Sequence, residues 1–302
     1  MAELGRFSSQ PSNRRFAVVT TCSSEGFEIY GRRMIESFDR YWPNQICLHL
    51  YAEGFTPDYS SPRIVVHDLK ETCPELTAFK KRHEHRPLAH GREHHRRILF
   101  RVRPRKLRMA LRLVDWGVGW RWDAVRFSHK IFAIDSAAGS VDADVLYWVD
   151  ADTVFFDHVP LAALEELMPE SCFVSYLGRK NISECGFVGY NLRHPETEHF
   201  IESLTRFYTS DSIFREKEYH DSYLFDRLRR RFEREGAQSY NISEGIIDEA
   251  GHVLVNSRLG QFMDHLKGDR KASGSSRIED LTAERSEAYW RNRTGNHMGE
   301  GG

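Results

Sequence analysis

Apolar residues along the chain alternate between short β-rich runs and longer stretches with helical spacing. The runs expected to form strands are 16–21, 46–51, 63–67, 145–149, 153–157, 171–176, 246–247 and 252–255. The stretches expected to form helices are 30–41, 123–134, 161–168, 196–208 and 223–234, with a further short one at 283–290. Strands and helices that alternate in this order are typical of an α/β domain.

The run from Val145 to Val149 is apolar throughout, with two aromatic residues and two valines, and acidic residues bound it. A strand without polar alternation suits a position that is covered on both faces of a parallel sheet. We therefore expect this run to be the central strand.

Two aspartates, Asp150 and Asp152, directly follow this predicted strand. Ligands of open α/β sheets bind at the carboxyl ends of the strands, and hard oxygen ligands there suit Mg²⁺ or Mn²⁺. An Asp-x-Asp sequence also begins ordinary surface turns. Two neighbouring acids beyond a buried strand repel each other unless a cation lies between them, so the context favours a metal site.

The composition is that of a globular protein whose charge is unevenly distributed. The 302 residues, 40% of them hydrophobic, suffice for one large α/β domain or two small ones. The formal net charge is −1, but thirteen Lys and Arg against two Glu give the segment 80–112 a charge of +11 and leave −12 elsewhere. This basic segment is expected to be either a solvated helical insertion or a patch that contacts phosphates or an anionic acceptor. No nucleic-acid-binding motif accompanies it, so direct nucleic-acid binding is not expected.

The cysteines and the N-terminal residues indicate which cellular compartment to expect for the protein. Five cysteines without a Cys-x-x-Cys pair favour reduced thiols in a cytoplasmic protein. No signal peptide or apolar run of ~18 residues is present, so no transmembrane segment is expected. The basic segment could add peripheral membrane contact. We expect a flexible tail at 1–15, a single domain at 16–271 and a polar, mobile tail at 272–302.

Two separated motifs resemble those of glycosyltransferases. The run Asp150-Ala-Asp152 after an apolar strand resembles the Asp-x-Asp signature of glycosyltransferases with the GT-A fold. The stretch His265-x-x-Gly268-x-x-Lys271 resembles the C-terminal His-x-x-Gly-x-x-Lys of glycosyltransferase family 8, the glycogenin-like group. The Pro-Trp that follows the lysine in that family is replaced here by Ala-Ser.

The resemblance implies a fold, a cofactor and residue roles. The fold would be a Rossmann-like GT-A domain with a mixed, mainly parallel sheet, which binds a nucleotide-sugar, expected to be a UDP-sugar, through Mn²⁺ or Mg²⁺. By the same resemblance, Asp150, Asp152 and His265 would be the metal ligands. Lys271 would contact the diphosphate, and Gly268 would let the backbone pass close to the phosphates.

Other residues are candidates for contact with the nucleotide-sugar. Thr20 and Thr21 end the first predicted strand and are expected to contact the nucleotide. Arg126, His129 and Lys130 share or adjoin one face of the predicted helix 123–134. These three side chains either reach the diphosphate or form an exposed face.

A carboxylate beside the transferred sugar would stabilise an oxocarbenium-like carbon or deprotonate the acceptor hydroxyl. Glu184 lies in the stretch 181–191, which combines a polar loop with a Gly-flanked strand where a ligand or another backbone could approach closely. Asp221 lies in a His-Asp-Ser stretch that also suits the N-terminal cap of a helix. These two acids are the catalytic candidates.

The expected function is therefore that of a metal-dependent glycosyltransferase, of the hexosyltransferase type, acting with retention on a saccharide, lipid-linked or protein acceptor. One alternative is a sugar-phosphate nucleotidyltransferase, which would carry a basic Gly-rich loop after the first strand, where residues 22–27 are not basic. Another is a non-catalytic protein whose basic segment binds an anionic polymer. We expect that segment, Arg96 and Arg97 included, to serve the acceptor.

Overall fold

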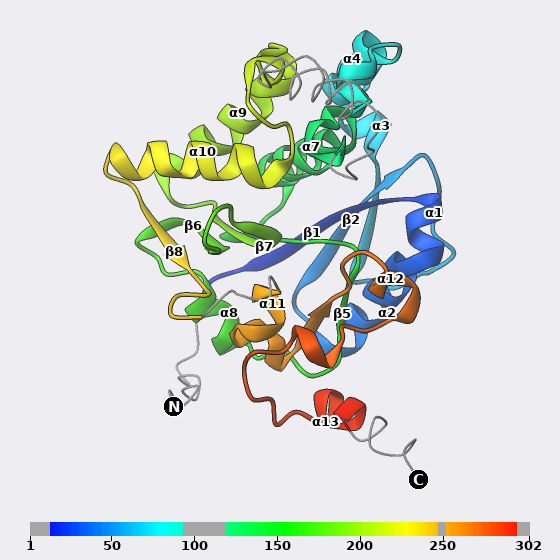
Figure 1. Ribbon diagram of the computed structural model, residues 1–302, viewed down its shortest axis with the longest axis vertical. Coiled ribbons are helices and arrows are strands. Elements are labelled where there is room, and N and C mark those ends of the chain that lie inside the picture. The colour runs from blue at the N-terminus through cyan, green and yellow to red at the C-terminus, as the bar shows by residue number, and fades with distance from the viewer. Residues whose placement is uncertain (1–12, 93–118, 247–251, 295–302) are drawn as a thin grey trace, which may run out of the picture.

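The computed structural model describes residues 13–92, 119–246 and 252–294. Its strands are β1 (Phe16–Ser23), β2 (Cys47–Glu53), β3 (Ile64–Asp68), β4 (Val145–Val149), β5 (Thr153–Phe155), β6 (Cys172–Leu177), β7 (Glu184–Asn191), β8 (Gln238–Asn241) and β9 (Met263–His265). Seven of them form one sheet in the order β3-β2-β1-β4-β7-β6-β8, and β5 pairs with β9 separately (Figure 1).

The directions of the strands bring several strand ends to one edge of the large sheet. Strand β1 runs parallel to β2 and to β4, and β2 runs parallel to β3. Strand β7 is antiparallel to both β4 and β6, whereas β8 is parallel to β6. The carboxyl ends of β1, β2 and β4 therefore lie at the same edge as the amino end of β7. The predicted mixed, mainly parallel sheet is confirmed.

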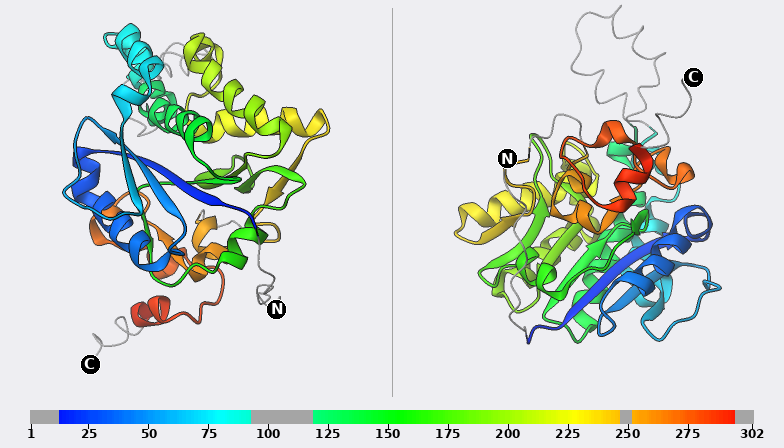
Figure 2. Two further views of the ribbon diagram at one scale, coloured as in Figure 1. Left: turned by 180° about the vertical axis from the view of Figure 1, so that it is seen from behind. Right: turned by 90° about the horizontal axis from the view of Figure 1, so that it is seen from below.

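Helices cover both faces of this sheet (Figures 1 and 2). One layer contains α3 (Leu69–Thr72), α4 (Pro74–His83), α7 (Ala124–Ser140), α9 (Pro195–Thr209) and α10 (Asp221–Arg234). The other side contains α1 (Ser24–Gly26), a π-turn (Phe27–Gly31), α2 (Arg32–Tyr41), α8 (Leu161–Leu167), α11 (Val253–Asn256), α12 (Arg270–Ser273) and α13 (Ala288–Thr294). Single 3₁₀ turns occur at Pro87–His90, Gly119–Trp122, Ser212–Arg215, Arg258–Gln261 and Ile278–Asp280.

Strand β4 is buried along its whole length between two apolar cores. Leu146 and Trp148 belong to the core beneath α7 and α9. Val145, Tyr147 and Val149 belong to the core beneath α2 and α8. Successive side chains of a strand point to opposite faces, so a strand covered on both sides must be apolar at every position. This confirms the predicted burial.

Three features between residues 238 and 256 differ from the predicted elements. The strand expected at 252–255 is wrong, because Val253–Asn256 forms the helical turn α11. Short apolar runs fit a buried helix or a buried strand equally well, and here the run packs beneath β7 and β9. Ile246 lies in neither helix nor strand, and residue 247 lies outside the described residues. The edge strand Gln238–Asn241 is too short and polar to be recognised from its pattern.

Residues 272–294, expected to be part of a mobile tail, are anchored to the domain. The side chain of Trp290 is 2% exposed, and its Nε1 donates a hydrogen bond of 2.8 Å to the carbonyl of Gly260. Nδ2 of Asn256 donates one of 2.8 Å to the carbonyl of Asp280. Figure 2 (right) shows this orange and red segment lying over the domain. The segment therefore helps to cover α11.

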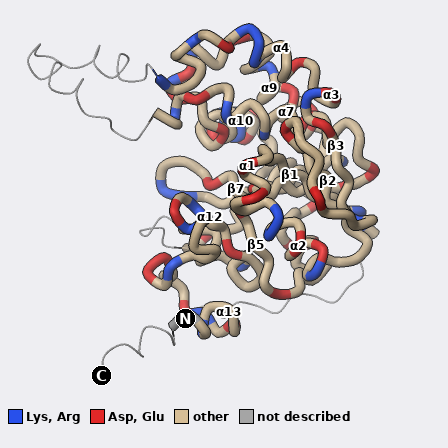
Figure 3. Tube along the Cα trace, turned by 90° about the vertical axis from the view of Figure 1, so that its right-hand side faces the viewer, with Lys and Arg blue, Asp and Glu red and all other residues tan. Residues whose placement is uncertain are grey.

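Only the first part of the basic segment 80–112 lies in the described residues. There, Nζ of Lys80 is 2.9 Å from Nε2 of His129, and Arg82 forms an ion pair of 3.0 Å with Asp211. Positive and negative residues are interspersed on the helices of this layer (Figure 3). The expected role of Arg96 and Arg97 lies outside the described residues.

Two further findings concern membranes and thiols. Within the described ranges, no helix has the length and apolar character needed to span a lipid bilayer. All five cysteines fall in those ranges, and none is in a disulfide.

Candidate metal and nucleotide site

A cavity of about 680 Å³ opens at the edge of the sheet where β1, β2 and β4 end. The strand ends supply Thr21 from β1, Glu53 from β2, Asp150 and Asp152 after β4, and Glu184 at the start of β7. Segments that are distant in sequence thus meet because the strands share this edge. This is the position at which α/β sheets bind ligands.

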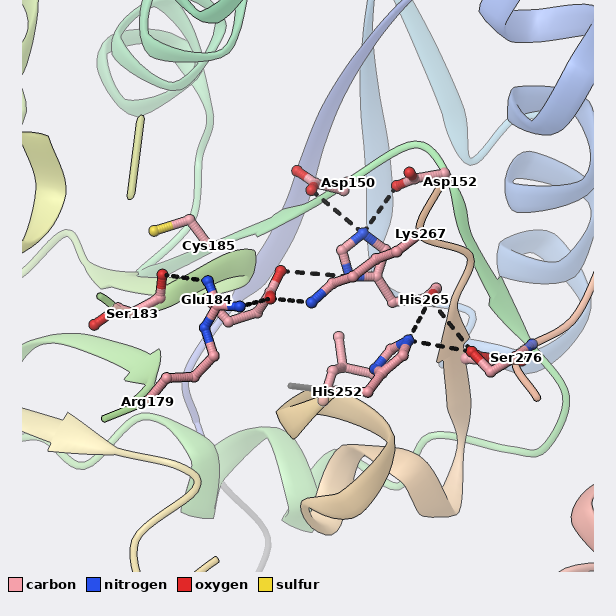
Figure 4. Close-up of polar contacts among 12 residues, drawn as sticks. Asp150, Asp152, Arg179, Ser183, Glu184, Cys185, His252, His265, Lys267 and Ser276 are labelled. Atoms are coloured by element: carbon pink, nitrogen blue, oxygen red, sulfur yellow. Dashed lines mark hydrogen bonds and ion pairs between the residues drawn. The ribbon is translucent and has the colours of Figure 1, made fainter. Parts of the chain in front are cut away.

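Asp150, Asp152 and His265 come together beside this cavity, with one ligand atom of each within 4.8 Å of the others. Nε2 of His265 is 3.0 Å from Oδ1 of Asp152 and 3.5 Å from Oδ2 of Asp150 (Figure 4). Strand β9 brings His265 here by pairing with β5, in which Thr153 is the partner of His265. Two carboxylates and one imidazole are a donor set that fits a divalent cation.

Glu184 lies behind the imidazole of His265. Its Oε1 is 3.5 Å from Nδ1 of His265, and its Oε2 forms ion pairs with Lys267 and, at 3.5 Å, with Arg179 (Figure 4). Burial opposes ionisation, but Lys267, His265 and Arg179 lower the pKa of Glu184 to about 2. The carboxylate is therefore charged at neutral pH. A carboxylate on the far nitrogen of a ligating histidine is a common way to orient the imidazole.

Gly186 provides the space that the imidazole occupies. A Cβ at this position would lie 2.5 Å from Cε1 and 2.6 Å from Nδ1 of His265, closer than such atoms can approach. The sequence predicted that a ligand or another backbone comes close to this strand. The structure places the side chain of His265 there.

Lys271 lies on one side of Asp150, Asp152 and His265, which we call the metal-site residues because they are the candidate ligands. Its Nζ is 2.8 Å from Oδ2 of Asp152 and 4.7 Å from the centre of the Tyr30 ring. Burial would raise the pKa of Asp152, but His265 and Lys271 together hold it well below its usual range. Lys271 is thus a cation beside the metal-site residues, on the side of β1 and Tyr30.

Lys130 lies on the opposite side and is buried, whereas Arg126 on the same helix is exposed. Its Nζ is 3.2 Å from Oδ1 of Asp150 and 2.8 Å from Oδ2 of Asp221. It also lies 4.7 Å from the centre of the Trp148 indole. Burial alone would lower the pKa of Lys130, but Asp150 and Asp221 raise it above its ordinary value. Lys130 is therefore charged and contributes no exposed face.

The other residues predicted to contact the nucleotide-sugar fall into two groups. Thr21, Arg126 and His129 line the cavity. Thr20 and Gly268 are not among its lining residues. Thr20 is buried, and its hydroxyl has no hydrogen-bond partner in the described part of the chain. Gly268 has φ of +61°, so its backbone conformation is itself a reason for glycine at the turn after β9.

A buried polar network behind His265 was not predicted. The backbone N–H of Ser276 donates a hydrogen bond of 2.7 Å to Oδ2 of Asp264, and the hydroxyl of Tyr289 donates one of 2.8 Å to the same oxygen. His252 contacts both Ser276 and the carbonyl of His265. Its members come from separate segments, so no local motif could have indicated it. The same is true of Lys267 and Arg179 beside Glu184.

Comparisons with known proteins give distant similarities. No protein-family model and no curated protein matches the sequence. The apo form of mouse xyloside xylosyltransferase 1 is similar with a TM-score of 0.44 and 8% identity, over 76% of this chain and 85% of that one. The apo bifunctional glycosyltransferase WbbM gives 0.41 and 11%, over 74% of this chain and 38% of that one. The apo glycosyltransferase GlyE of Streptococcus pneumoniae TIGR4 gives 0.39 and 12%, over 78% and 46%.

Proposed function

We propose that this protein is a metal-dependent glycosyltransferase that transfers a sugar from a nucleotide-sugar, with a UDP-sugar as the first candidate, to an acceptor hydroxyl. The observation that carries the proposal is the meeting of Asp150, Asp152 and His265, with Lys271 beside them, at the carboxyl edge of the sheet. The GT-A fold and the family 8 resemblance are part of the proposal.

The residues at this site suit a divalent cation and a diphosphate together. Asp150, Asp152 and His265 would hold Mn²⁺ or Mg²⁺, and the carboxylate of Glu184 keeps the imidazole in place from behind. When bound, the cation would neutralise charge that develops on the diphosphate leaving group. Lys271 would exchange part of its contact with Asp152 for a phosphate oxygen and so add a second positive charge.

The transfer joins the acceptor oxygen to the anomeric carbon while the bond from that carbon to the diphosphate oxygen breaks. The electron pair of the broken bond leaves with the diphosphate, and the acceptor proton passes to a base. Asp221 and Glu184 both have pKa values below the ordinary range, despite their burial, because Lys130 lies beside Asp221 and Lys267 beside Glu184. Ionised carboxylates of this kind stabilise a cationic carbon better than they accept a proton.

We assign the electrostatic role at the anomeric carbon to Asp221. It lines the cavity and its one cationic contact within ion-pair distance among the described residues is Lys130. Glu184 already contacts Lys267, Arg179 and His265. Its carboxylate is therefore assigned to orienting the imidazole of His265. The two acids thus have different proposed roles.

The test is a screen of UDP-, GDP-, CDP- and dTDP-sugars for hydrolysis with Mn²⁺ or EDTA. We expect one UDP-sugar to be hydrolysed in Mn²⁺ and not in EDTA, and Asp152→Asn to abolish the reaction. Asp157→Asn, at an exposed acid nearby in sequence, serves as the matched control. Hydrolysis that is equally fast in EDTA, or in Asp152→Asn, would refute the metal-dependent site.

A further inference from the structure

An exposed indole lies at the wall of the cavity. Trp120 lines the cavity and is 44% exposed. Only three other large apolar residues in the described part of the chain are comparably exposed: Ile29, Val65 and Val66. None of those three lines the cavity. Large aromatic surface left open to solvent at a polar cavity is typical of a ligand contact.

The backbone that carries Trp120 is held by long-range hydrogen bonds. Nε1 of Trp122 donates a hydrogen bond of 2.9 Å to the carbonyl of Lys217. The backbone N–H of Tyr219 donates one of 2.7 Å to the carbonyl of Arg121. The indole is therefore presented by a fixed 3₁₀ turn and costs little conformational entropy when a ligand binds.

Two other rings pack beside this indole. The ring centre of Trp120 is 5.2 Å from that of His220 and 6.3 Å from that of Phe127. Nε2 of His220 is 2.9 Å from Oε2 of Glu218, and His220 is buried, so the imidazole is fixed in turn. We call Trp120, Phe127 and His220 the aromatic platform.

The aromatic platform adjoins the proposed catalytic carboxylate. His220 directly precedes Asp221, which shares the ammonium of Lys130 with the first aspartate of the metal site. Lys271, the cation proposed for the diphosphate, contacts the second aspartate, Asp152, instead. The metal-site residues therefore have two different sides. Lys271, proposed to contact the diphosphate, lies on one side, and Asp221 and the aromatic platform lie on the other.

We propose that the aromatic platform binds the acceptor and that the acceptor is a saccharide, an inference that rests on the proposed function. One face of a pyranose ring presents C–H groups, and stacking that face on the indole removes apolar surface of both from water. The hydroxyl groups at the ring edge then find polar partners in the same cavity, among them Ser222 and Asp123. A lipid-linked or peptide acceptor would use the flat indole less fully.

The experiment compares transfer with donor hydrolysis. It uses the UDP-sugar identified by the screen, Mn²⁺, and methyl glycosides of glucose, galactose, xylose and N-acetylglucosamine as acceptors. We expect Trp120→Ala to raise KM for the accepted glycoside roughly tenfold, as for the loss of one stacked ring, and to leave donor hydrolysis unchanged. Trp120→Phe should recover most of the affinity. Val66→Ala, at an exposed apolar residue of β3, is the control.

Two outcomes would overturn the saccharide proposal while the proposed function stands. One is an unchanged glycoside KM in Trp120→Ala. The other is an equal loss of hydrolysis and transfer, which would place the indole against the donor. A chain that hydrolyses no nucleotide-sugar refutes the proposed function instead. In that case, quenching of tryptophan fluorescence by the glycosides, present in the native chain and absent from Trp120→Phe, still supports the platform, and its absence overturns it.

Discussion

The main-chain carbonyl of His265 accepts a hydrogen bond of 2.9 Å from Nε2 of His252. The same nitrogen is 3.2 Å from Oγ of Ser276, whose hydroxyl donates in turn to Asp264. Burial lowers the pKa of His252 to about 4, so the imidazole is neutral and its proton lies on Nε2, which faces the carbonyl. This network fixes the backbone of the histidine in the proposed metal site.

We expect His252→Ala to weaken Mn²⁺ binding by roughly 10–100-fold, because outer partners of metal ligands typically contribute that much to affinity. The substitution removes the His252 donor from the carbonyl of His265, which keeps the backbone N–H of Lys267 at 3.0 Å, and lets β9 shift. Calorimetry with Mn²⁺ alone measures the effect, and thermal unfolding checks the fold. Ser273→Ala, at an exposed serine of the same segment, should bind as the native chain does. Native Mn²⁺ affinity in a folded His252→Ala variant would contradict this role.

Gly186→Ala should abolish Mn²⁺ binding in a folded protein. The added methyl group would lie 2.5 Å from Cε1 of His265, and the imidazole must rotate or move away from Asp152. The control is Gly139→Ala within α7, where a Cβ meets no atom within 4 Å. That control should gain about 0.5–1 kcal/mol in free energy of unfolding, as alanine replaces glycine in a helix. Unchanged Mn²⁺ affinity in Gly186→Ala would show that His265 is no ligand.

Substitution of the two carboxylates should have different kinetic effects. Asp221→Asn should lower kcat and kcat/KM alike, by roughly 100-fold, because its charge acts on the transition state. Glu184→Gln should instead raise the Mn²⁺ concentration needed for half-maximal activity and recover at saturating Mn²⁺. Steady-state kinetics over a series of Mn²⁺ concentrations separates the two cases. Identical behaviour of both variants would refute the division of roles.

Stability should depend on pH through Asp135 of α7. Burial, followed by repulsion from Glu75 and Glu202, raises the pKa of Asp135 from 3.8 to about 6. The native state then holds this proton more tightly than the unfolded state does. The resulting stabilisation is complete below the unfolded pKa and is lost as the pH rises through about 6.

Asp135→Asn should therefore raise the free energy of unfolding by ~1 kcal/mol at pH 7.5, a value reduced to allow for solvent screening of this partly exposed group. At pH 4 the variant should match the native chain. Urea unfolding at both pH values measures the difference, with Asp157→Asn as the exposed control. A stabilisation of equal size at both pH values would have another cause.

The sequence alone determined the elements whose signal is local. Every position from Val145 to Val149 is apolar, which is sufficient to predict burial on both faces, and the pattern that ends there places Asp150 and Asp152 at the edge of a sheet. The helix 123–134 was likewise readable from its spacing, and α7 contains all of it except Asp123, which caps the helix. Periodicity and composition are properties of a few neighbouring residues, so they can be read from the sequence without knowledge of the fold.

Tertiary structure decided what those residues contact. Lys130 could have been exposed, and only the packing of α7 on β1 and β4 puts its ammonium between Asp150 and Asp221. Glu184 has the sequence context of a catalytic acid, but His265 at the end of β9 and Lys267 just beyond it make Glu184 a partner of the imidazole in the proposed metal site. The electrostatic environment of each of these two groups is set by several charged neighbours that are distant in sequence. They exist only once the strands are ordered in the sheet.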